Sequence, residues 1–267
     1  MRKILDQLNR EIEIPANPDR IVSLVPSQTE LLVDMGLKNA IDGITKFCVH
    51  PEGLRKEKNV VGGTKQVHYD KIRLLNPDII LCNKEENTEE MVLELEKIAP
   101  VHVSDVKDLK DSLQLINQYG KIFQVEDRAL SIRKEIELQW EQFQTFIEKQ
   151  PQRCVAYLIW KNPWMAAGGD TFIDYLLEMN HFENVFRKEK SRYPEIDLSS
   201  LRAKNAHLVL LSTEPFPFKD KHKEELQVKL PEQEIIVVDG EFFSWYGSRL
   251  VKAFNYFREL HLSLHNS

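Results

Sequence analysis

The sequence has few cysteines, no long apolar run and no excess of basic residues. Its three cysteines, Cys48, Cys82 and Cys154, lie far apart and cannot form a disulfide framework. No stretch reaches the roughly 18 apolar residues of a membrane-spanning helix, so we expect no membrane insertion. Lysine and arginine together number 36 against 42 acidic residues, which gives a net charge of −6. With no basic run along the chain, we also expect no nucleic-acid partner.

Several short motifs of known chemistry are missing as well. The sequence contains no G-x-S-x-G, no P-loop, no G-x-G-x-x-G and no H-E-x-x-H. Its first 20 residues lack the apolar core of a secretory signal peptide. The sequence as written therefore predicts a cytoplasmic location, whereas a leader removed before this start would make the protein periplasmic.

The sequence does have a regular alternation of strand-like and helix-like segments. RIVSLV at 20–25 precedes SQTELLVDMGL, and NPDIILC at 76–82 precedes TEEMVLELEKI. Such alternation indicates a parallel sheet covered by helices. Ser27, with Glu30 three residues later, forms a capping-box pattern and predicts a helix start at Ser27. A second helix start is expected at Asp170.

One segment breaks this alternation. Between Glu126 and Lys149 there is no glycine or proline, and apolar residues recur at steps of three and four, which predicts one long helix. The alternation resumes after Pro151, and VPSQTELLVDMGL resembles AGGDTFIDYLLEMN of the second half. We predict an α/β fold of two Rossmann-like lobes with parallel sheets joined by one long backbone helix. The expected boundaries are 1–123 for the N-terminal lobe, 124–150 for the helix and 151–267 for the C-terminal lobe.

In open parallel sheets, ligands bind beyond the carboxyl ends of the strands, which selects the loops after each predicted strand. If the two lobes face each other, these loops line one cleft. Aromatic residues crowd the loops of the second half and suit a flat apolar ligand, although packing between lobes would explain some of them. The residues that we predict to contact a ligand are Ser27, Gln28, Lys46, Phe47, His50, Thr64, Lys65, Glu85, Glu86, Trp160, Trp164, Phe216, Trp245 and Tyr246.

A metal site is a further hypothesis. Cys48 and His50 are separated by one residue, so in an extended segment both side chains point to one side. Zinc needs three or four ligands, and Glu85 or Glu86 would have to supply the third. The alternative for residues 84–86 is an ordinary solvated surface turn.

These segments resemble a known family. RIVSLVPSQTELLVDMGL, VGGTKQVHYDKIRLLNPDIIL and the long helix that follows resemble class III substrate-binding proteins of ABC importers. That family captures cobalamin, haem and ferric siderophores. TKFCVHP, NKEEN and FFSWYGSR resemble a branch described as helical-backbone metal receptors. The resemblance implies binding of a metal complex between two lobes and no catalysis. We also expect a monomer that requires no cofactor.

The resemblance also implies roles for individual residues. The family's cobalamin pocket aligns with His50, Thr64 and Tyr193, of which Tyr193 alone is aromatic here. Arg249 is a further ligand-contact candidate, because a guanidinium pairs well with a carboxylate, although a salt bridge inside one lobe is an equal alternative. The acidic residue through which the N-terminal lobe docks an ABC permease aligns with Asp70.

We therefore expect a binding protein that holds a metal complex, such as a ferric siderophore, cobalamin or haem, with an ABC permease as partner. The first alternative is a cytosolic metal-handling protein or enzyme on the same scaffold, using Cys48, His50, Glu85 and Glu86. The second is a protein–protein adaptor whose aromatic loops form a flat patch.

Overall fold

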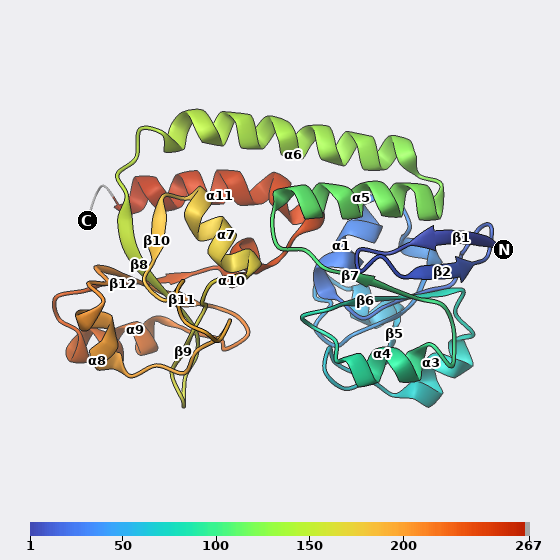
Figure 1. Cartoon of the computed structure of the whole chain (residues 1–267), viewed down its shortest axis with the longest axis horizontal. Helices are drawn as coiled ribbons and strands as arrows, with labels where there is room; N and C mark the ends of the chain where they lie inside the picture. Colours follow the sequence, from blue (N-terminus) through green and yellow to red (C-terminus); the bar gives the residue numbers. More distant parts are fainter. Residues whose placement is uncertain (265–267) are drawn as a thin grey trace. The chain divides into compact units, whose positions relative to one another are not determined.

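The computed structural model describes residues 1–264, so the last three residues of the expected C-terminal lobe lie outside the described residues. The chain forms two compact units, visible as separate α/β bodies in Figure 1. Unit 1 contains Met1–Leu138 together with Trp245–Val251. Unit 2 contains Gln139–Ser244 and the chain from Lys252 onward. Two α/β units with mainly parallel sheets confirm the predicted fold class.

Unit 1 is built on a five-stranded parallel sheet with the strand order β5-β4-β3-β6-β7. The strands are β3 (Ile21–Ser23), β4 (Ile41–Ile44), β5 (Asn59–Val60), β6 (Ile79–Asn83) and β7 (Val101–Ser104). Every residue of β3, β6 and β7 is buried. A strand covered on both faces has no polar side to alternate with, which explains why these segments are largely continuous apolar runs.

Helices cover both faces of this sheet. They are α1 (Pro26–Asp34), η1 (Lys38–Ala40), α2 (Leu54–Glu57), α3 (Tyr69–Leu75), α4 (Glu89–Leu95) and α5 (Leu109–Phe123). On one face, Val22 of β3 packs in a cluster with Ile72 of α3 and Leu95 of α4. Successive strand residues point to opposite faces, and on the other face the His102 imidazole of β7 contacts the Gln118 amide of α5, with Nε2 and Oε1 3.3 Å apart.

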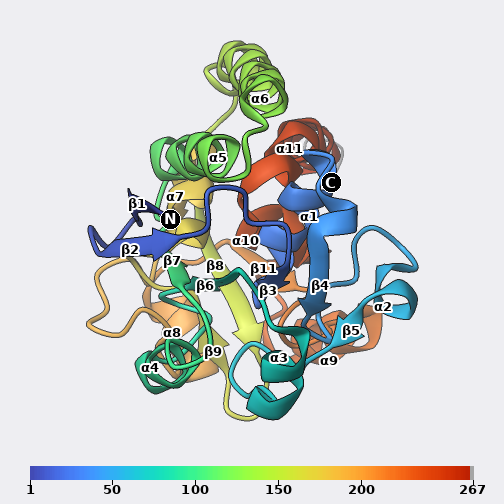
Figure 2. The same ribbon diagram turned by 90° about the vertical axis from the view of Figure 1, so that its right-hand side faces the viewer.

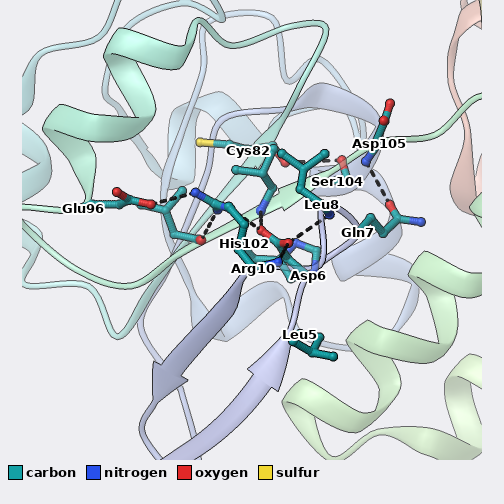
Figure 3. A network of polar contacts seen from close by, with 12 residues as sticks. Leu5, Asp6, Gln7, Leu8, Arg10, Cys82, Glu96, His102, Ser104 and Asp105 are labelled. Atoms are coloured by element: carbon teal, nitrogen blue, oxygen red, sulfur yellow. Dashed lines mark hydrogen bonds and ion pairs between the residues drawn. The ribbon is translucent and has the colours of Figure 1, made fainter.

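An antiparallel hairpin precedes this sheet, in a segment to which the sequence analysis assigned no structure. Its strands are β1 (Arg2–Leu5) and β2 (Glu11–Ile14), drawn near the N-terminus in Figures 1 and 2. The buried carboxylate of Asp6 in the turn pairs with Arg10 Nε at 2.8 Å and accepts a hydrogen bond from the Val103 N–H (Figure 3). These contacts fix the turn beside β7, and alternation of polar and apolar residues over only four positions is too short a signal to predict the hairpin.

Unit 2 is built on a second sheet, in which four strands run parallel in the order β10-β8-β11-β12 and β9 pairs antiparallel with β8. The strands are β8 (Arg153–Trp160), β9 (Met165–Ala166), β10 (Phe182–Asn184), β11 (Leu208–Ser212) and β12 (Glu234–Val238). The helices are α7 (Phe172–Met179), α8 (Leu198–Ala203), α9 (Asp220–Lys229), α10 (Gly240–Ser244) and α11 (Leu250–Leu264). The helix start expected near Asp170 corresponds to α7, and the alternation of strands and helices expected after Pro151 is present.

The predicted long helix is α6 (Glu126–Ile147). The division between the two compact units falls inside it, after Leu138. Each half is held by its own neighbours: Arg133 donates to Asn117 Oδ1 at 2.9 Å in unit 1, whereas Phe143 packs against Phe254 of α11 in unit 2. The helix is thus shared by the two units instead of forming a separate connector.

The expected helix start at Ser27 is corrected by one residue. Helix α1 begins at Pro26, and Val25 occupies the N-cap position without a side-chain capping bond. Proline suits the first helical position, because it has no N–H there to leave unsatisfied. Glu30 does not close a capping box on Ser27, since its carboxylate turns to Arg249.

The expected helix start at Asp170 is also displaced, since α7 begins two residues later, at Phe172. Thr171 is the N-cap of α7, and its hydroxyl accepts a hydrogen bond from the Asp174 N–H at 3.0 Å. Asp170 lies outside the helix with a left-handed backbone, φ 55°. The threonine hydroxyl thus supplies the cap that the sequence analysis assigned to the aspartate.

Candidate functional site

The carboxyl ends of the strands in unit 1 lie at one edge of its parallel sheet. We call this the unit-1 edge: the start of α1 after β3, and the loops 45–53, 61–68, 84–88 and 105–108 after the other four strands. The segment Trp245–Val251, here called the strap, joins the same unit. The predicted ligand contacts on the unit-1 edge and strap are Ser27, Gln28, Lys46, Phe47, His50, Thr64, Lys65, Glu85, Glu86, Trp245, Tyr246 and Arg249.

A buried polar network centred on Gln28 lies beneath this edge. The Gln28 Nε2 donates to Ser104 Oγ at 2.6 Å and to the Tyr246 hydroxyl at 2.9 Å. Its Oε1 accepts from the Tyr119 hydroxyl at 2.6 Å. Burial raises the pKa of both tyrosines, so both hydroxyls stay protonated. A buried amide with partners on both atoms is satisfied within the protein, and Gln28 and Tyr246 shape the edge from inside.

A buried ion pair attaches the strap to α1. Arg249 Nε lies 2.9 Å from Glu30 Oε2, and the two side chains are only 6% and 9% exposed. The guanidinium carbon of Arg249 also lies 4.9 Å from the centroid of the Trp245 ring, a cation–π distance. Burial raises the pKa of Glu30, although the neighbouring Arg249 opposes that shift. The positive charge of Arg249 therefore has a partner inside unit 1. Of the two partners considered from the sequence, this is the salt bridge inside one lobe and not a ligand carboxylate.

The outer part of the unit-1 edge presents two lysine side chains and one large apolar ring. Phe47 is 48% exposed, and Lys46 Nζ lies 5.0 Å from its ring centroid. Lys65 Nζ donates to the Glu85 carbonyl at 2.5 Å, which ties the loop after β5 to the loop after β6. The backbone carbonyl of Thr64 accepts a second bond between these loops, from Asn87 Nδ2 at 2.7 Å. The exposed groups thus stand on loops that are fixed to each other.

The hypothesis of a metal at Cys48 and His50 gains no third ligand. Over residues 1–264, no group of three or more histidine, cysteine, aspartate or glutamate residues is placed to hold a metal ion. The buried Cys48 Sγ lies 3.2 Å from Thr29 Oγ1 and 3.3 Å from Thr45 Oγ1. Burial raises the pKa of this thiol and disfavours the thiolate that a metal requires.

The corresponding edge of unit 2 is aromatic. The rings of Trp164 and Phe218 stack at 5.9 Å with an interplanar angle of 7°. Phe216 lies 4.7 Å from Phe218 and 5.6 Å from Trp160, the latter edge to face. Trp160 is 39% exposed, whereas Phe218 is buried. Lys161 pairs with Glu225 and approaches the Trp164 ring to 5.7 Å. The structure thus brings together Trp160, Trp164 and Phe216, three of the predicted ligand contacts.

Two predicted residues lie apart from these clusters. Tyr193 belongs to the loop after β10, is half-buried and donates its backbone N–H to Ser191 Oγ at 3.2 Å. Asp70 lies in the first turn of α3 with a side chain 95% exposed, and pairs with Arg73 at 2.9 Å. A hollow of about 510 Å³, lined in part by Asp70 and Glu94, opens there.

The sequence analysis missed several residues that build the unit-1 edge. Asn83 and Ser104 end β6 and β7, and Asn83 Nδ2 donates to Ser104 Oγ at 3.0 Å. Polar residues that end apolar strands are a signal that could have identified both. Tyr119 and Glu30 lie within helical segments and gave no such signal.

Comparison of the sequence with known families identifies one family. The profile of the periplasmic binding protein family matches residues 21–232. The chain belongs to this family, as the resemblance implied. In the part of the chain that the structure describes, no helix is both long and apolar enough to cross a membrane.

Individual relatives are distant. The chain is 25% identical over 188 residues to the uncharacterized ABC transporter substrate-binding lipoprotein YvrC of Bacillus subtilis, an alignment that covers 67% of this chain and only 59% of that protein. It is 23% identical over 206 residues to a vitamin B12-binding protein of Vibrio vulnificus, covering 75% and 74% of the two chains. The crystal structure of a periplasmic vitamin B12-binding protein of Vibrio cholerae matches with a TM-score of 0.80 at 15% identity, covering 95% and 100%. At 15% identity, this structural similarity shows a shared fold alone.

Proposed function

We propose that the protein is the substrate-binding component of an ABC importer and that it captures a metal complex of the ferric siderophore, cobalamin or haem class. The family match over residues 21–232 carries the proposal. The names of the two sequence relatives, a substrate-binding lipoprotein and a vitamin B12-binding protein, support the ligand class. Members of this family bind substrates, and we propose that the ligand leaves chemically unchanged.

The accessible side chains at the two sheet edges suit such a ligand. Phe47 at the unit-1 edge and Trp160 in unit 2 are large rings with 48% and 39% of their surface exposed. Exposed rings offer a flat apolar face to a macrocycle or an aromatic chelator. Lys46 adds positive charge beside Phe47, and Lys65 adds a second positive charge on the loop after β5. Both charges favour ligand carboxylates. We propose these four residues as ligand contacts, while Gln28, Tyr246 and Arg249 support the edge from within.

The proposal includes a membrane partner. An importer's binding component delivers its ligand to an ABC permease, and we propose that Asp70 contributes to that docking surface. Its carboxylate is almost fully exposed, and its one described ion pair, with Arg73, is on the surface. A surface pair of this kind exchanges easily for a partner's cation, because it contributes little free energy.

The test is a binding titration of the purified chain with cyanocobalamin, haemin and a panel of ferric siderophores. Tryptophan fluorescence reports binding, and free tryptophan corrects for absorption by coloured ligands. We expect saturable binding of one class, and mass spectrometry of the released ligand should show no chemical change. Phe47→Ala and Trp160→Ala should each weaken binding by about fivefold or more. The control is Leu74→Ala, whose side chain is 85% exposed on α3 and away from either edge. Absence of binding by every probe would contradict the proposal.

A further inference from the structure

The strap is closely seated on unit 1, although its residues are more than 100 positions from the helices that it touches. The Gly247 N–H donates to Ser112 Oγ of α5 at 3.0 Å. Gly247 has φ 86°, and a Cβ there would meet the Leu31 side chain of α1 at 3.4 Å. The Tyr246 hydroxyl joins the network of Gln28. The strap is therefore held at three successive points, by α1, α5 and the buried polar network.

A continuous series of contacts runs from α1 through the strap to the loop after β4. Glu30 pairs with Arg249 at 2.9 Å, and the Arg249 guanidinium lies 4.9 Å from the centroid of the Trp245 ring. The same indole meets the His50 imidazole edge to face, with ring centroids 5.5 Å apart and an interplanar angle of 79°. Trp245 is thus placed between a fixed cation and the imidazole, and a rotation of the indole would break both contacts.

His50 is the end of this series that reaches the accessible part of the edge. It is half-buried and shares the loop after β4 with the exposed Lys46 and Phe47. Its neighbour in the fold, Trp245, is 6% exposed and does not itself present much surface. An imidazole that is packed on one side and accessible on the other keeps one orientation for a ligand, and such preorganisation favours affinity.

We propose that Trp245 and Arg249 are positioning residues that hold His50 and its loop in the ligand-competent arrangement. The affinity of the unit-1 edge would then depend on two residues near the C-terminus, Trp245 and Arg249, that lie beneath it. This inference rests on the proposed function for its effect on binding, whereas the positioning of His50 can be measured without a ligand.

The first experiment observes His50 directly. Imidazole resonances are recorded on histidine-labelled full chain, and His50→Gln identifies the signal. Trp245→Leu should move the His50 resonance, because the ring current of the indole is lost. Glu30→Gln combined with Arg249→Met removes both charges together and leaves no buried ion unpaired. This double variant should also move the His50 signal while the other histidines keep theirs. An unchanged His50 signal in the folded double variant would overturn the proposal.

The second experiment measures affinity for cyanocobalamin and haemin by isothermal titration calorimetry. Trp245→Leu and the double variant should each lower the affinity for the probe that binds by about fivefold or more. Trp245→Phe should restore most of the affinity. The control, Trp140→Leu, removes an indole of α6 that packs on Phe254 in unit 2, and should stay near wild type. A moved His50 signal with unchanged affinity contradicts the proposal. If the wild-type chain binds neither probe, these two probes are excluded as ligands, and the resonance experiment alone decides the positioning.

Discussion

The two sheet edges are built by different means. The unit-1 edge rests on buried polar and charged groups, with Gln28 and Glu30 bonded to a strap more than 200 residues away. The unit-2 edge rests on stacked rings, with Trp164, Phe216 and Phe218 coming from two loops of the same unit. Polar pairs demand matched partners and exact distances, whereas ring contacts tolerate variation. We therefore expect unit 1 to be the more sensitive of the two to single substitutions.

The largest effect is expected from Arg249→Met. This substitution leaves the buried Glu30 carboxylate without its hydrogen-bonded cation, which should cost unit 1 about 3–5 kcal/mol of unfolding free energy. The matched change in unit 2 is Lys161→Met, whose partner Glu225 is exposed, and it should leave the unfolding midpoint nearly unchanged. Urea unfolding with hydrogen exchange resolved by peptide measures both. Equal losses in the two units would remove the contrast.

A pH effect of about 3 kcal/mol is expected from His102 in unit 1. Burial lowers the pKa of this imidazole to about 4, although Asp6 opposes the shift, whereas an unfolded histidine titrates near 6.5. Between these values the unfolded chain binds the proton and the folded chain does not. The contribution of His102 to the unfolding free energy is therefore fully present above about pH 6.5. It decreases by about 3 kcal/mol in total as the pH falls to about 4.

The measurement for His102 is the unfolding free energy at a series of pH values. His102→Gln keeps a polar side chain of similar size without a titrating proton, so its pH dependence between 6.5 and 4 should be flatter than that of the wild type. If the pH dependence of the wild-type unfolding free energy persists in His102→Gln, groups other than His102 cause it.

An intermediate difference is expected between two buried tyrosines. Tyr246→Phe removes a hydroxyl that accepts from Gln28, and should destabilise unit 1 by about 1–2 kcal/mol because the amide loses a buried partner. Tyr157→Phe removes a hydroxyl that donates to Ser212 Oγ at 3.0 Å in unit 2. Ser212 keeps its bond to the Glu214 carbonyl, so the cost should be nearer 0.5–1 kcal/mol. The reverse order in urea unfolding would contradict the comparison.

The smallest contrast concerns helix caps, where the two units should respond alike. Thr88 caps α4 by accepting from the Met91 N–H at 3.2 Å, and Thr171 caps α7 at 3.0 Å. Replacement of either threonine by alanine should cost about 1 kcal/mol, and serine should restore most of the loss. Thermal unfolding of the four variants tests this, and a much larger loss in one unit would show that its cap does more than end a helix.

The fold was predictable to the extent that it depends on local patterns. The apolar runs that contain β3, β6, β8 and β11, and the periodicity of α6, extend over enough residues to specify element type. The hairpin β1–β2 was missed, because four-residue strands give almost no periodic signal. The starts of α1 and α7 were misplaced by one and two residues, because Pro26 suits the first helical position and Thr171 suits the N-cap.

The site was less predictable, since its parts are distant in sequence. Position after a strand is a local signal, and it selected Lys46, Phe47 and Lys65, which the structure places on loops of the unit-1 edge. Nothing local indicates that Arg249 pairs with Glu30, because 219 residues separate them. A buried ion pair between residues so far apart in the sequence is fixed by the tertiary fold alone. From the sequence, a ligand carboxylate is an equally good partner for Arg249.

The strap has a consequence for the order in which the chain can fold during synthesis. Unit 1 lacks its last segment until residue 251 has left the ribosome, although the rest of the unit is complete at residue 138. At about 5–20 residues per second, the intervening stretch of roughly 110 residues occupies on the order of 5–20 s. During that interval the nascent unit 1 has a carboxylate at Glu30 and no Arg249 to neutralise it. The first-made half of the protein is thus finished only when the last-made helix begins to emerge.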